Sequence, residues 1–189
     1  MTLTAIDPGS ALVVIDLQKG IVSALDAPAV TDAVEHAARL ATEFRRHRLP
    51  VVLVNVTGRA PGRTDGGRSA RRTAALPTGW ADLMDELDVQ PTDHLITKRR
   101  RSAFHDTGLD TLLRDLGVTQ IVLAGISTGS GVESTARAAS DHGYHVVLAT
   151  DAMTDPDAEA HRHSVERVFP KIGETATAAE VVDMIEATR

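Results

Sequence analysis

The sequence has no cysteine among its 189 residues. Disulfide bonds, thiolate metal sites and nucleophilic attack by a cysteine of this chain are therefore excluded. Aromatic residues are also scarce, at 3% of the chain, which argues against an aromatic platform for stacked bases or flat cofactors. We accordingly expect chemistry that uses neither a thiol nor a cofactor.

Long apolar runs and an excess of basic residues are missing as well. No run approaches the ~20 apolar residues that span a bilayer, and residues 1–7 show neither the basic nor the apolar part of a signal peptide. The net charge of −6 argues against nonspecific binding to nucleic acid. We expect a cytoplasmic protein whose partner is a small-molecule substrate, with no membrane or nucleic-acid partner.

The residues that are present have the pattern of a single α/β domain over 1–189. Short apolar, β-branched runs alternate with segments of helical period, which is typical of a parallel sheet covered by helices. A segment rich in Gly, Pro and Arg, Thr57–Thr78, is too long for a tight connection and is predicted to be a lid. Strands are expected at 11–15, 51–56, 94–97, 120–124 and 145–149, with an edge strand near 172–175, and helices at 31–47, 80–87, 109–116, 132–142, 157–169 and 178–187.

Polar residues follow three of the expected strands. Asp16 ends the first apolar run, Lys98 follows the third strand, and the glycine-lined turn Gly125–Gly131 follows the fourth. Ligands of open parallel sheets bind beyond the carboxyl ends of the strands. We therefore expect a pocket in which Asp16 takes part in proton transfer. The alternative is an Asp16–Lys98 ion pair with a purely structural role.

Four consecutive cations begin at Lys98 and end at Arg101. Such a run is often a solvated surface, but alternate residues after a strand point in opposite directions, so Lys98 and Arg100 would face the pocket. Further arginines in the predicted lid would add guanidinium groups that bind anions. An anionic small-molecule substrate is the resulting expectation; the arginines of the lid are Arg59, Arg63, Arg68, Arg71 and Arg72.

The turn Gly125–Gly131 has three interpretations. Its N–H groups could cradle an oxyanion or carboxylate, or the turn could serve only to pack a helix closely on the sheet. Its first five residues also match G-x-S-x-G, which would make Ser127 a hydrolase nucleophile, with Asp151 and either His161 or His163 following in the right order. Neither a dinucleotide nor a P-loop pattern is matched, and the histidines lack metal-ligand spacing, so no metal is expected.

Three segments resemble the isochorismatase-like hydrolase superfamily, which includes nicotinamidases, carbamoylsarcosine amidases and isochorismatases. They are Ala11–Gln18, Lys98–His105 and Gly125–Arg137, followed by Gly143-Tyr144 and Asp151–Met153. The resemblance implies a three-layer α/β/α Rossmann-like sandwich with a six-stranded, mostly parallel sheet. It also implies a homo-oligomer, a dimer or tetramer.

In the amidases of this superfamily the catalytic residues are an aspartate, a lysine and a cysteine. Asp16 and Lys98 match the first two, and Gly131 takes the place of the cysteine, as in isochorismatases. The resemblance further implies a cis peptide bond between Ser127 and Thr128. The residues then expected to contact substrate are Gln18, Arg100, Ser127, Thr128 and Ser130.

The hypothesis that follows is hydrolysis without a nucleophilic side chain. Protonated Asp16 would donate to the methylene carbon of an enol ether, and water would capture the resulting oxocarbenium ion. Lys98 would hold Asp16, and Arg100 and the N–H groups of the turn would bind carboxylates. Two alternatives remain: a family member that binds a small molecule without catalysis, and a serine hydrolase that uses Ser127 or Ser130.

Overall fold

The computed structural model describes residues 3–25, 28–58 and 76–188 and contains a six-stranded parallel sheet. The strand order is β3-β2-β1-β4-β5-β6, and every neighbouring pair is parallel. The strands are β1 (Ser10–Ile15), β2 (Val51–Val56), β3 (His94–Lys98), β4 (Gln120–Ile126), β5 (His145–Thr154) and β6 (Glu174–Ala176). The sheet confirms the expected α/β fold.

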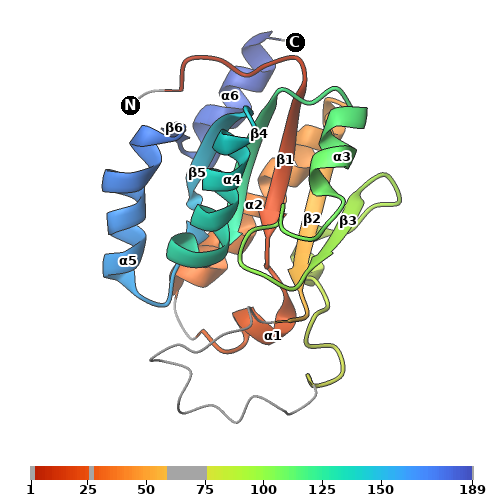
Figure 1. The fold of residues 1–189 in the computed structure, drawn as a ribbon, viewed down its shortest axis with the longest axis vertical. Helices are drawn as coiled ribbons and strands as arrows, with labels where there is room; N and C mark the ends of the chain where they lie inside the picture. Colours follow the sequence, from red (N-terminus) through yellow and green to blue (C-terminus); the bar gives the residue numbers. More distant parts are fainter. Residues whose placement is uncertain (1–2, 26–27, 59–75, 189) are drawn as a thin grey trace.

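Helices cover both faces of this sheet (Figure 1). One apolar core lies under α2 and α6, and a second lies on the opposite face under α3 and α4. Strand β1 serves both cores because Leu12 and Val14 point to one face while Val13 and Ile15 point to the other. The helices are α1 (Lys19–Val22), α2 (Pro28–Arg46), α3 (Leu109–Asp115), α4 (Glu133–Asp141), α5 (Ala158–His163) and α6 (Ala178–Thr188).

The two central strands approach closely because of a glycine near the end of β4. Gly125 has a φ of +121°, and a Cβ on it would lie 2.0 Å from the carbonyl oxygen of Ile15. Only glycine combines this backbone conformation with that contact. The approach places the turn that follows β4 beside Asp16, at the carboxyl end of β1.

Several expected boundaries are wrong. The expected helix at 80–87 is reduced to a short 3-10 helix, Asp85–Leu87. Strand β5 continues to Thr154, so Asp151 lies within it rather than after it. The expected helix at 157–169 divides into α5 and a π-helical segment, Ser164–Val168.

The predicted lid falls mostly outside the described residues. The structure describes only Thr57, Gly58 and residues 76–78 of it. Within the described part of the chain, no helix has the length and apolar character needed to cross a membrane.

Candidate active site

A buried ion pair lies at the carboxyl edge of the sheet. Asp16 directly follows β1 with a φ of 54°, and its N–H donates to the carbonyl of Val54 at 2.8 Å. Lys98 is the last residue of β3, and its side chain reaches Asp16 across the end of β2. The Nζ–Oδ2 distance is 2.7 Å, with the Lys98 and Asp16 side chains only 2% and 7% exposed.

The two carboxylate oxygens of Asp16 have different surroundings. Oδ2 accepts from Lys98, whereas buried Oδ1 has no hydrogen-bond partner among the described residues. Burial raises the pKa of Asp16 to about 6, although the charge and hydrogen bond of Lys98 oppose the rise. Because Oδ2 is held by an ammonium, a proton on this carboxyl group belongs on Oδ1.

Lys98 has no proton left for a substrate. Besides Asp16, its ammonium donates to the carbonyls of Arg100 at 3.2 Å and Arg101 at 2.9 Å. These three acceptors match the three hydrogens of the group. The lysine therefore holds Asp16 in place and leaves that carboxyl group as the exchangeable acid.

Gly131 faces this pair from the turn after β4. A Cβ at this position would lie 3.2 Å from Asp16 Oδ2 and 3.1 Å from Ile15 Cγ2. The structure thus brings together Asp16, Lys98 and Gly131, the three residues that the resemblance matched to the catalytic positions of the amidases. A longer side chain at residue 131 would press on the carboxylate.

A threonine missed by the sequence analysis connects the two halves of this site. The buried Thr135 hydroxyl accepts from the N–H of Ala103, at 3.0 Å, and donates to the carbonyl of Gly131, at 2.7 Å. It thereby ties the segment after Lys98 to the turn. Its spacing, four residues after Gly131 on a helix, was the available signal.

The N–H groups of the turn are less available than the cradle interpretation requires. Gly129 donates to Asp155 Oδ2 at 2.8 Å, while Ser130 and Val132 both donate to the carbonyl of Ser127. The cis peptide bond also differs from the expectation. It joins Ile126 to Ser127, one residue earlier than the resemblance implied.

The described residues do not assemble a serine triad. His161 Nδ1 shares a 2.9 Å hydrogen bond with Thr128 Oγ1, not with Ser127, and Thr128 is fully buried. Asp151 pairs instead with His36, at 3.5 Å. The hydroxyl group next to a histidine is therefore an inaccessible one.

Two predicted substrate contacts already have protein partners. The buried Gln18 amide donates to the carbonyls of Val56 and Trp80 and accepts from the N–H of Val56. It fixes the end of β2 to the loop that carries Trp80. Arg100 is half-buried, and its guanidinium donates to the carbonyl of Arg99 at 3.0 Å.

Comparison with known proteins identifies the family of this chain. Residues 10–180 match the isochorismatase domain. The chain is 39% identical over 181 residues to the uncharacterized isochorismatase family protein YwoC of Bacillus subtilis, with 94% of each chain covered. It is 28% identical to a maleamate amidohydrolase of Pseudomonas putida, over 93% of this chain and 86% of that protein.

A solved structure supports the same relationship. The isochorismatase family protein of Burkholderia thailandensis has a TM-score of 0.83 and 38% identity, over 96% of this chain and 98% of that one. The chain therefore belongs to the isochorismatase family of hydrolases.

Proposed function

We propose that this protein hydrolyses a small anionic molecule without a covalent enzyme intermediate, with Asp16 as general acid. The observation that supports this most directly is the buried Asp16–Lys98 pair. Asp16 Oδ1 has no hydrogen-bond partner among the described residues, and Oδ2 lies beside a glycine instead of a thiol. A pKa of about 6 leaves part of the Asp16 population protonated near neutral pH, as a general acid requires.

A carboxylated enol ether is the substrate class that suits such an acid. Asp16 transfers its proton to the methylene carbon, where the electron pair of the C=C bond forms the new C–H bond. Water adds to the resulting oxocarbenium carbon and returns a proton to the carboxylate of Asp16. The hemiketal then collapses to an alcohol and pyruvate, and Lys98 remains an ammonium ion throughout.

Some of the remaining predicted residues are proposed to contact the substrate, and the others to position the site. Arg100, Ser127 and Ser130 are the proposed contacts for the substrate carboxylate and oxygen atoms. Gln18 and Thr128 are proposed to position the site, because their polar atoms are engaged by Val56, Trp80 and His161.

Amide hydrolysis is the second candidate, favoured by the relative named a maleamate amidohydrolase. In this chain water would have to attack the carbonyl, with ionised Asp16 as its general base. The two reactions need opposite protonation states of Asp16. Enol-ether hydrolysis should slow as pH rises through about 6, whereas amide hydrolysis should become faster.

The test is a panel of carboxylated enol ethers, esters and amides, with products identified by mass spectrometry. For an enol ether in D₂O, proton transfer to carbon leaves one deuterium in the methyl group of pyruvate.

Asp16→Asn should lower kcat/KM by at least ~10²-fold, while Asp183→Asn, an exposed acid on α6, should not change it. Full activity of Asp16→Asn would refute the proposal. A panel with no turnover would favour a binding protein.

A further inference from the structure

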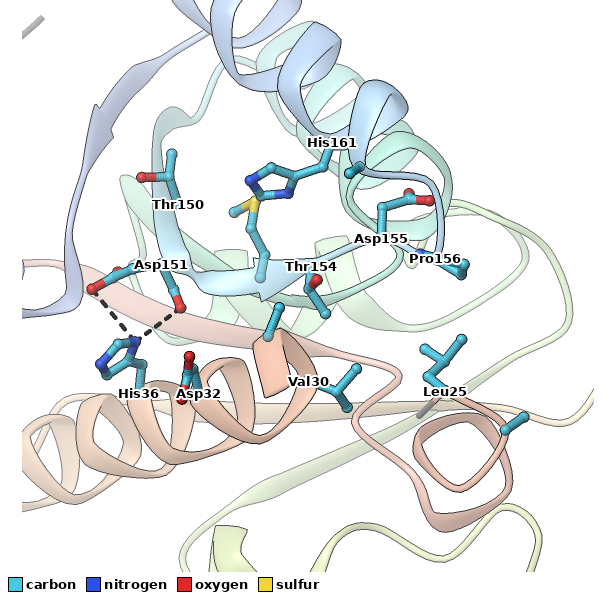
Figure 2. Close-up of a pocket in the computed structure, with 14 residues that line it drawn as sticks. Leu25, Val30, Asp32, His36, Thr150, Asp151, Thr154, Asp155, Pro156 and His161 are labelled. Atoms are coloured by element: carbon cyan, nitrogen blue, oxygen red, sulfur yellow. Dashed lines mark hydrogen bonds and ion pairs between the residues drawn. The ribbon is translucent and has the colours of Figure 1, made fainter. Parts of the chain in front are cut away.

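A hollow lies at the carboxyl end of β5. Its volume is about 610 Å³, which falls in the range of small-molecule sites. Figure 2 shows His161 directed into it from α5, with Leu25 and Val30 at the opposite side. None of the proposed catalytic residues lines this hollow.

Acidic side chains predominate around this hollow. Asp32, Asp151 and Asp155 line it, and no lysine or arginine does so among the described residues. Burial lowers the pKa of His161, so its ring is neutral at neutral pH and does not repel a cation. His36 is already held by Asp151.

One of the three acids is free to bind a ligand. Asp151 accepts from the N–H of Ala178, and Asp155 accepts from Gly129 and Asp157. The carboxylate of Asp32, on the exposed side of α2, makes no hydrogen bond or ion pair with any described residue. Its carboxylate is therefore the group best placed to pair with a ligand charge.

The rest of the wall is apolar and fits the body of a small molecule. Ala24, Leu25, Val30, Pro156 and Ala158 supply it. We propose that the hollow binds a small organic ammonium or amidinium compound, with its cationic group at Asp32 and its apolar body against Leu25 and Val30. Attraction by the carboxylate of Asp32 and burial of the apolar body would act together.

A ligand in this hollow would change the surroundings of the turn in the active site. His161 bonds Thr128, and Asp155 accepts from the N–H of Gly129. Both residues also line the hollow. A ligand that moves either side chain must therefore alter the environment of residues 128 and 129.

The test uses ¹H–¹⁵N NMR titration of the whole protein with 4-phenylbutylamine, and it needs no knowledge of the substrate. The neutral and anionic analogues are 4-phenylbutan-1-ol and 4-phenylbutanoate. We expect the amine to shift the amides of Leu25, Val30 and Gly129 and to bind at least about fivefold more tightly than the alcohol, with the acid weakest.

A pair of matched substitutions tests whether the carboxylate of Asp32 binds the ammonium group. Asp32→Asn should weaken amine binding about fivefold, while Asp115→Asn, an exposed acid on α3, should leave it unchanged. Equal affinities for the three probes, or shifts confined to other surfaces, would overturn the proposal. Concentration-dependent shifts of these amides without ligand would also overturn it, because a second copy would then cover the hollow.

Discussion

The length of the lysine side chain is what makes the Asp16–Lys98 pair possible. The two residues belong to β1 and β3, which are separated by β2. Neighbouring strands lie about 4.8 Å apart, so the side chain must span a gap of roughly two such spacings. Lys98 closes this gap with a 2.7 Å contact, which a shorter cation could not make from the same strand.

The protonation of Asp16 is the first property to measure. Burial raises the pKa of Asp16 to about 6, above the ordinary aspartate value of about 4. ¹³C NMR of the side-chain carboxyl carbons should show one resonance with a midpoint near pH 6, absent in Asp16→Asn. A spectrum in which every aspartate titrates below pH 5 would contradict this assignment.

Removing the lysine should cost stability in a pH-dependent way. In Lys98→Met, Asp16 loses the interactions that lower its pKa, so its folded-state pKa rises above 6. The carboxyl group is neutral at pH 5 and tolerates the loss, but at pH 8 its ionisation opposes folding. We expect the loss in free energy of unfolding to be about 2 kcal/mol larger at pH 8 than at pH 5.

Urea denaturation at the two pH values measures this difference. The control is Lys171→Met, which removes an exposed lysine. It should lower the free energy of unfolding by the same small amount at both pH values. A pH-independent loss in Lys98→Met would mean that Asp16 does not respond to its partner.

The residues of the site differ in how far sequence could predict them. Asp16 and Lys98 follow apolar runs, and parallel strands bring their carboxyl ends to one edge, so their proximity follows from topology. The Thr128–His161 contact joins residues 33 apart through the packing of α5. No local pattern encodes that distance.

At the scale of elements, strand cores were easier to predict than ends. The run Val51–Val56 matches β2 without error because four of its six residues are the β-branched valine. By contrast, β5 extends to Thr154 past polar Thr150 and Asp151, since pairing with β4 resumes at Met153 after a register shift. Such pairing depends on the partner strand, so the end of β5 cannot be predicted from its own sequence alone.

The contact between β1 and β4 predicts a large penalty for a small substitution. Gly125→Ala would put a Cβ 2.0 Å from the Ile15 carbonyl in a backbone conformation that L-residues rarely adopt. We expect a loss of more than about 2 kcal/mol in the free energy of unfolding. Gly108→Ala is the matched control, since nothing lies within 4 Å of a Cβ there. Similar denaturation midpoints for both variants would show that the strands can separate without cost.

At the scale of the whole molecule, two apolar cores share one sheet. Phe44 belongs to the core under α2, and Phe169 to the core on the opposite face, and both are fully buried. Because β1 contributes alternate residues to each core, loss of packing on one face must disturb the strand that supports the other. The site lies at the carboxyl end of this same strand, where Asp16 follows Ile15.

This sharing predicts that the chain unfolds as one unit. Phe44→Ala and Phe169→Ala should each lower the free energy of unfolding by about 3–5 kcal/mol, with one transition seen by both far-UV circular dichroism and tryptophan fluorescence. The only tryptophan, Trp80, is held to Gln18 at the edge of the sheet, so its fluorescence reports on the site. A fluorescence transition at lower denaturant than the dichroism transition would show that this edge opens independently. Two separate dichroism transitions would refute a single domain.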